Sequence, residues 1–213
     1  MPPRAQLDHI VVAVSRLDDG IAQFERLTGV RPGVGGRHPG RGTENALVSL
    51  GGGSYLEIIA PQPAASLSPR DEMMRRLAHL TIVNWAVCVP EVDAAVGALR
   101  GAGFATSPPQ PGARLTTSGE RLDWMTFGLE DQGITGAPFF IRWSPNTRHP
   151  STTATGGCTL EHLSIAGPDG GRLTKMLRAL DVGGIEVTEG AAAIQAALAC
   201  GSTRAILTSA SAT

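Results

Sequence analysis

Two kinds of hydrophobic pattern alternate along the start of the chain. Residues 7–14, LDHIVVAV, form a short β-branched run that is typical of a buried strand. The segment that follows carries apolar residues at helical spacing: Leu17, Ile21, Phe24 and Leu27. Gly29 ends this helix, and apolar runs at 46–50 and 55–60 predict further strands. The predicted order is one strand, one helix, and then two or three strands.

The same order returns farther along the chain. Residues 82–89 are strand-like, and an apolar stripe over 92–99 predicts a helix. A short strand is predicted at 104–106, followed by a loop at 108–112. The remaining strands of this second unit are predicted at 115–117, 122–127 and 139–143.

A third unit begins in the same way but is harder to follow. Residues 160–166, LEHLSIA, echo the first strand, a helical stripe follows, and 185–188 is strand-like. After that the pattern weakens, with 191–199 compatible with a helix and 205–208 with a strand. We therefore expect only a partial third unit over 158–209.

These patterns divide the chain into units with a helix between the first two. Ser68-Pro69-Arg70-Asp71 has the N-cap, first-turn proline and acidic residue of a helix start, which predicts a helix running to about Leu80. The predicted units are a first module at 5–61, a connecting helix within 62–80, and a second module at 81–145.

Composition narrows the classes of protein that fit. Of the 213 residues, 42% are hydrophobic and 17% charged, which is enough apolar surface for a core. The formal net charge of −1 gives no electrostatic case for binding nucleic acid or an anionic membrane surface. The longest apolar runs are strand-length, so no membrane-spanning helix is expected.

The number and spacing of the cysteines indicate the cellular compartment. Cys88, Cys158 and Cys200 are odd in number and far apart in the sequence. Together with the missing apolar leader after Met1, they predict a cytoplasmic protein with three free thiols.

Four segments resemble a known family. The LDHIVVAV strand is one, and 35–45 carries a GG-x-H-x-G-x-GT-x-N pattern. The others are YLE at 55–57 and PFFIRW at 138–143, with His149-Pro150 shortly after. Over residues 7–150 the chain resembles the glyoxalase-like domain family of the vicinal oxygen chelate superfamily, which includes glyoxalase, bleomycin-resistance and dihydroxybiphenyl dioxygenase proteins. The resemblance implies an α+β fold of paired βαβββ modules. These would form a half-open, barrel-like mixed sheet with a ligand site on its concave face.

The resemblance also implies where a metal would bind. In the superfamily a module offers one ligand from its first strand and one from its last, which here are His9 and Glu57. The other interpretation of His9 is a structural histidine in the core. Alignment of the two modules puts Asn84 opposite His9 and Arg142 opposite Glu57, and a guanidinium cannot ligate a metal. We therefore expect at most a weakly bound divalent metal, and no nucleotide cofactor because no phosphate-binding glycine motif is present.

Other polar residues are candidates for contact with a ligand. Arg142 could bind a substrate carboxylate or phosphate, or else form a salt bridge with Glu57. His38 could act as a general base, with Thr43 and Asn45 as ligand-binding neighbours; alternatively, these side chains only satisfy the backbone of their own hairpin.

Trp124 is either a core residue or the wall of an apolar pocket. We expect His9, His38, Asn45 and Glu57 to converge on one concavity, with Arg142 reaching it from the second module.

Two functions follow from this interpretation. One is an enzyme in which a divalent metal held by His9, Glu57 and a third group polarises a vicinal oxygen pair on a small substrate and stabilises an enolate, as in lyase, isomerase or dioxygenase chemistry. The other is a metal-free protein that sequesters a small anionic or aromatic metabolite, as bleomycin-resistance proteins do. Expected partners are a small molecule and a second copy of the chain in a homodimer, with no nucleic acid and no membrane.

Overall fold

The first module has the βαβββ order that its hydrophobic pattern predicts. The computed structural model describes residues 4–38, 40–63, 65–68, 72–130 and 133–210. The elements of the first module are β1 (Gln6–Ala13), α1 (Leu17–Thr28), β2 (Gly33–His38), β3 (Thr43–Ser49) and β4 (Tyr55–Pro61).

The second module repeats this order and differs from the expectation in two strands. Its elements are β5 (Thr81–Cys88), α3 (Val92–Gly101), β6 (Gln110–Thr116), β7 (Arg121–Phe127) and β8 (Phe139–Trp143). Most of the expected loop at 108–112 belongs to β6, because its backbone pairs with β7 from Gln110 onward. The strand expected at 104–106 is reduced to one bridge between Thr106 and Leu129.

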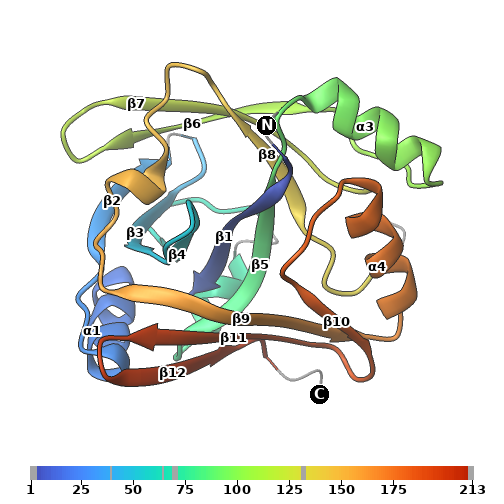
Figure 1. The fold of residues 1–213 in the computed structure, drawn as a ribbon. Coiled ribbons are helices and arrows are strands. Elements are labelled where there is room, and N and C mark those ends of the chain that lie inside the picture. The colour runs from blue at the N-terminus through green and yellow to red at the C-terminus, as the bar shows by residue number, and fades with distance from the viewer. Residues whose placement is uncertain (1–3, 39, 64, 69–71, 131–132, 211–213) are drawn as a thin grey trace.

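The two modules form a closed barrel. The strand order is β1-β4-β3-β2-β6-β7-β8-β5, and β5 pairs back onto β1 (Figure 1). In each module the first strand lies parallel to the last. The α+β fold of paired modules is thus confirmed. The opening expected on one side is closed by a short pairing of β2 with β6, at Gly36↔Thr116 and Arg37↔Leu115.

Side-chain alternation divides the barrel into two environments. On β4, Leu56 and Ile58 point outward into the main core with the helices, whereas Tyr55 belongs to a smaller cluster inside the barrel. Glu57 alternates with the outward residues and faces inward with Tyr55. The interior is therefore where polar side chains of several strands meet.

The C-terminal unit is more complete than expected. It contains β9 (Cys158–Gly167), α4 (Gly170–Ala179), β10 (Glu186–Glu189), β11 (Ala193–Cys200) and β12 (Thr203–Thr208). These strands form a separate sheet in the order β10-β9-β11-β12, which runs along the bottom of Figure 1. The interpretation of 191–199 as a helix is wrong. Alanine favours helices, but pairing with β9 and β12 and burial of alternate residues decide for a strand.

The connecting helix expected within 62–80 is only partly covered by the described residues, and it ends at Arg76 rather than at about Leu80. The structure describes a 3-10 turn, η1 (Met73–Arg76), and a second such turn, η2 (Pro150–Thr152), after the barrel. Residues 64 and 69–71 lie outside the described part of the chain, so most of the predicted helix start is not covered. No helix among the described residues is long and apolar enough to cross a membrane.

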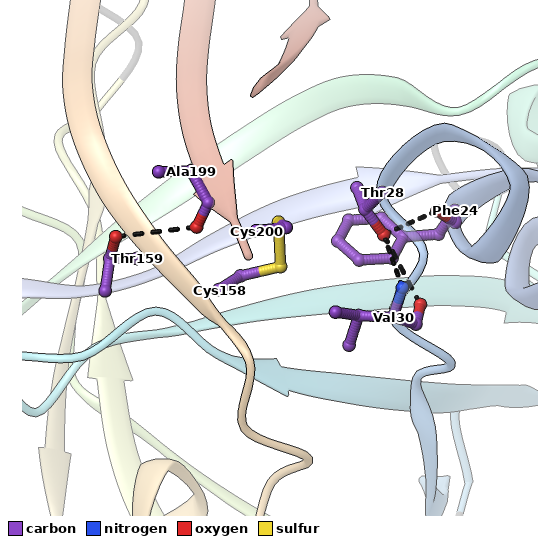
Figure 2. The surroundings of a disulfide bond; sticks show 7 residues. All are labelled: Phe24, Thr28, Val30, Cys158, Thr159, Ala199 and Cys200. Atoms are coloured by element: carbon purple, nitrogen blue, oxygen red, sulfur yellow. Dashed lines mark hydrogen bonds between the residues drawn. A yellow bond between two sulfur atoms is a disulfide. The ribbon is translucent and has the colours of Figure 1, made fainter. Parts of the chain in front are cut away.

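The expectation of three free thiols is wrong. Cys158 and Cys200 are register partners at the paired ends of β9 and β11 and form a disulfide. Figure 2 shows this disulfide beside the end of α1, near Phe24 and Thr28. Cys88 is the one free cysteine among the described residues, and the cysteines no longer argue for a cytoplasmic location.

Thiol counting tests this disulfide. Denatured protein that has not been reduced should titrate one thiol, that of Cys88, and three after reduction. Cys158→Ser should lower the free energy of unfolding by about 4 kcal/mol, because the bridge closes a long loop. Cys88→Ser is the control and should leave no thiol before reduction. Three thiols in unreduced wild-type protein would contradict the assignment.

Candidate functional site

Glu57 is the centre of a polar cluster inside the barrel. Its Oε2 lies 3.8 Å from Nε2 of His9, and its Oε1 lies 3.6 Å from Nε2 of His38. Asn45 donates from Nδ2 to Oε1 at 2.6 Å. The four side chains come from β1, β2, β3 and β4, and all are buried. The structure thus brings together the four residues that the sequence placed in one concavity.

Thr43 and Trp124 border this cluster on the side of His38. The Thr43 hydroxyl lies 3.0 Å from Nδ1 of His38, and the Trp124 ring meets the His38 ring edge-on at 6.3 Å. Trp124 also packs against Trp143 across β7 and β8. Both tryptophans therefore form one wall of the interior.

The electrostatics of the cluster favour an ionised carboxylate beside a neutral imidazole. Burial alone raises the pKa of Glu57, but His38, His9 and the Asn45 hydrogen bond outweigh it and hold that pKa below its usual value. Burial lowers the pKa of His38; nearby Arg114 adds to this effect and Glu57 opposes it. Near neutral pH the cluster therefore combines a buried proton acceptor with an uncharged histidine.

Arg142 does not reach this cluster. It lies on the outer face of β8, donates to the carbonyl oxygen of Trp143, and pairs with Glu91 at 3.2 Å. The inward residues of β8 are Phe139, Ile141 and Trp143. The expected placement is wrong because a shift of one residue in aligning the two modules moves a side chain to the other face of a strand.

Arg114 of β6 takes the place that was expected of Arg142. Its side chain is buried and donates from Nη1 to the carbonyl oxygen of Gly35 at 2.6 Å. Its charge lowers the pKa of Glu57 and of His38, so it lies within electrostatic range of both. Arg114 was not among the expected site residues, because the pattern predicts a loop at 108–112 and a strand that begins only at 115.

A cavity of about 200 Å³ opens beside Arg114. Its lining includes Gly35, Leu47, Leu122 and, at the surface, Arg148. A larger cavity of about 460 Å³ lies around Asn84 and the loop after β7. Among the described residues that line the larger cavity, no charged side chain is buried, whereas the smaller cavity is lined by the buried Arg114. The smaller cavity is therefore the better ligand site, although it has less than half the volume.

Asp8 is a second residue that the sequence analysis missed. Strict alternation would put it on the opposite face from His9, but a bulge between Leu7 and His9 turns both side chains into the interior. Its carboxylate accepts hydrogen bonds from His9 at 2.6 Å, His149 at 3.1 Å and the Trp143 indole at 3.0 Å. The signal was a carboxylate next to a histidine within an otherwise apolar strand.

These contacts make Asp8 an acid-sensitive part of the fold. Burial raises its pKa, but the hydrogen bonds from His149 and His9 outweigh it, so the pKa lies well below the usual value. A lowered pKa contributes stability that is present above the unfolded-state value of about 3.9 and is lost as the pH falls through the lower folded-state value.

Asp8→Asn should therefore cost about 2 kcal/mol at neutral pH, the contribution of hydrogen bonds to a buried charge. The difference from wild type should shrink once the pH falls below about 3.9. Chemical denaturation at several pH values measures both quantities. A difference that stays constant into strong acid would show that the Asp8 charge is not the cause.

The cluster does not fit a tightly held metal ion. Among the described residues, no group of three or more His, Cys, Asp or Glu side chains is arranged to hold one. The strand pairings place Ala86 and Ile141 of the second module where His9 and Glu57 stand in the first, and neither can ligate. The positive charge of Arg114 also acts on Glu57, the one carboxylate of the His9–Glu57 pair, and would repel a metal ion there. Weak metal binding stays a prediction.

Comparisons with known proteins bear on the family and the fold. A family described as a glyoxalase-like domain matches residues 7–180, which covers both barrel modules. A comparison with curated proteins found no match. A hypothetical protein from Staphylococcus aureus is similar in structure, with a TM-score of 0.64 and 14% identity over 96% of this chain and 85% of that one.

Two further structures each cover about two thirds of this chain. A hypothetical protein from Bacillus halodurans C-125 has a TM-score of 0.50 and 18% identity, over 68% of this chain and 98% of that one. Methylmalonyl-CoA epimerase from Mycobacterium tuberculosis has a TM-score of 0.45 and 21% identity, over 65% and 87%. The likeness to the two hypothetical proteins shows the fold alone and carries over no activity.

Proposed function

We propose that this chain, which belongs to the glyoxalase-like domain family, binds a small carboxylate inside its barrel and uses Glu57 to remove a proton next to a carbonyl group. The observation that carries this proposal is a buried, ionised carboxylate with an imidazole nitrogen within 4 Å of each of its oxygens. Burying such a charge is unfavourable unless it is paired, and its lowered pKa keeps it deprotonated at neutral pH.

The ligand class follows from Arg114 and Asn45. A guanidinium presents several donors in a plane that matches a carboxylate, and Arg114 faces the interior next to a cavity. Asn45 Oδ1 is buried without a hydrogen-bond partner among the described residues. An acceptor of this kind is unfavourable in a core, which supports a role in binding a ligand that carries a donor.

The chemistry balances without a redox partner. The Glu57 carboxylate takes the proton from carbon, and the electron pair of the C–H bond moves onto the neighbouring carbonyl, which becomes an enolate. A neutral His38 with its proton on Nε2 can donate a hydrogen bond to that oxygen. Return of the proton from Glu57 to the same carbon regenerates substrate or its epimer, and return to a different atom gives an isomer.

Deuterium exchange tests the proposal without knowledge of the product. Small carboxylates with an acidic C–H, such as pyruvate, 2-oxobutyrate, acetoacetate and methylmalonate, are incubated with the protein in D₂O and followed by proton NMR. We expect at least one to lose its C–H signal faster than without protein. Binding without exchange across the panel would overturn the enzyme proposal. It would favour sequestration, which the wall of Trp124 and Trp143 also suits.

Arginine variants test the binding geometry. Arg114→Gln should weaken binding of the exchanging carboxylate by about tenfold to a hundredfold, since it removes a charged hydrogen-bond donor. Arg142→Gln is the matched control and should bind normally, because Arg142 lies on the outer face of β8. Titration calorimetry measures both. Loss of binding in Arg142→Gln, with Arg114→Gln unaffected, would reverse this assignment.

A further inference from the structure

Asp8 is buried in the barrel and has no part in the proton transfer described above. Its Oδ2 lies 3.0 Å from Nε1 of Trp143 and 3.1 Å from Nε2 of His149, and its Oδ1 lies 2.6 Å from Nδ1 of His9. An indole N–H can only donate, so Oδ2 is an acceptor. One carboxylate thus joins two histidines from distant parts of the chain.

The hydrogen bond at Nδ1 of His149 determines which of its two ring nitrogens carries the proton. Nδ1 of His149 lies 3.2 Å from the backbone N–H of Ser151 and accepts from it. A backbone amide can only donate, so this Nδ1 carries no proton. A neutral His149 therefore has its proton on Nε2 and donates it to Asp8. Both neighbours of Oδ2 are donors, which is the arrangement that an ionised Asp8 requires.

The Asp8 pKa lies well below its usual value, so the carboxylate is ionised near neutral pH and its Oδ1 can only accept. Nδ1 of His9, at 2.6 Å from Oδ1, is therefore the donor. We propose that Asp8 is a positioning residue that holds His9 with its proton on Nδ1 and leaves Nε2 as a proton acceptor facing Glu57. Nε2 lies 3.8 Å from Oε2 of Glu57. The ring is also held by stacking on Tyr55 at 4.6 Å and by an edge contact with Phe139 at 5.4 Å.

This arrangement deepens the proposed function and rests on it. After Glu57 has taken the substrate proton on Oε2, Nε2 of His9 can accept that proton, which restores the Glu57 carboxylate. His9 becomes an imidazolium, keeps its Nδ1 proton, and is stabilised by the carboxylate of Asp8. The opposite tautomer, with a proton already on Nε2, could not accept, so Asp8 decides whether His9 takes part.

The tautomers can be measured directly in wild-type protein. Two-bond proton–nitrogen NMR of ¹⁵N-histidine-labelled protein, at a pH above the usual imidazole pKa of about 6.5, reports which nitrogen of each ring is protonated. His9→Gln and His149→Gln assign the signals. We expect Nδ1–H for His9 and Nε2–H for His149. A wild-type His9 with its proton on Nε2 would overturn the proposal, whatever the behaviour of any variant.

Asp8→Asn provides the second test, because its amide can satisfy the cluster in only one orientation. The Trp143 and His149 donors require the amide oxygen at the Oδ2 position, which turns the NH₂ group toward Nδ1 of His9. His9 should then switch to the Nε2–H tautomer. Ser151→Ala is the control: it removes a hydroxyl from His149 without touching Asp8, and His9 should keep its wild-type tautomer.

The activity of Asp8→Asn distinguishes this inference from the proposed function. Exchange should fall by about a hundredfold or more at saturating carboxylate, with the affinity for carboxylate little changed, since binding depends on Arg114. If wild-type protein shows the expected tautomers but no exchange, the proposed chemistry fails while the Asp8–His9 assignment stands. If Asp8→Asn switches the tautomer and exchange is unchanged, the positioning role is wrong.

Discussion

Replacing Gly36 with alanine should lower the free energy of unfolding by about 4 kcal/mol, the sum of a strained backbone and an overfilled contact. Gly36 has φ 143°, a conformation that residues with a side chain rarely adopt. A Cβ at this position would lie 1.9 Å from the carbonyl oxygen of Leu115 on the neighbouring strand. That contact is part of the short β2–β6 pairing that closes the barrel, so the added methyl would separate the two modules there.

Gly119 offers a matched control for Gly36→Ala. It also has a positive φ, 83°, but a Cβ there would meet nothing within 4 Å. Gly119→Ala should cost only about 1 kcal/mol, the backbone part of the effect. Urea denaturation of both variants measures the difference. Equal losses would mean that closure between β2 and β6 contributes little to stability.

The repeated order of strand and helix was predictable because both modules carry clear periodicities. Residues 7–14 and 82–89 are dense in apolar side chains, and their helices show regular stripes, so patterns within one segment were sufficient. The C-terminal sheet was less predictable because the alanines of β11 favour a helix locally, and only pairing with β9 and β12 makes the segment a strand. Likewise, the cysteines are 42 residues apart, and register rather than spacing joins them.

The polar cluster was predictable only for residues whose inward face agrees with strict alternation along their strand. His9, His38, Asn45 and Glu57 face the interior in this way, and they meet as expected. Asp8 could not be found in this way, because a bulge reverses its face. Arg142 was expected on the wrong face because facing depends on register between strands, which a single sequence leaves open by one residue. Arg114 was not expected in the interior because its strand was predicted to begin only at 115.

Glu57→Gln should reduce deuterium exchange into a bound carboxylate by at least about a hundredfold, the contribution typical of a general base. Glutamine keeps the size of the side chain and an oxygen that can accept from Asn45, so the barrel should still form and Arg114 should still bind the ligand. In wild-type protein the protonation of Glu57 should not limit the exchange rate near neutral pH, and the rate should fall only in acid. The reason is that its lowered pKa keeps the carboxylate ionised until the pH drops below the usual value of about 4.3.

Glu44→Gln is the control on the adjacent strand β3, where the carboxylate pairs with Arg37 at 3.7 Å, and it should exchange at the wild-type rate. Exchange is measured at saturating ligand, and titration calorimetry measures the affinity separately. Together they distinguish a loss of chemistry from a loss of binding. Exchange by Glu57→Gln at the wild-type rate would remove Glu57 as the base and with it the proposed reaction.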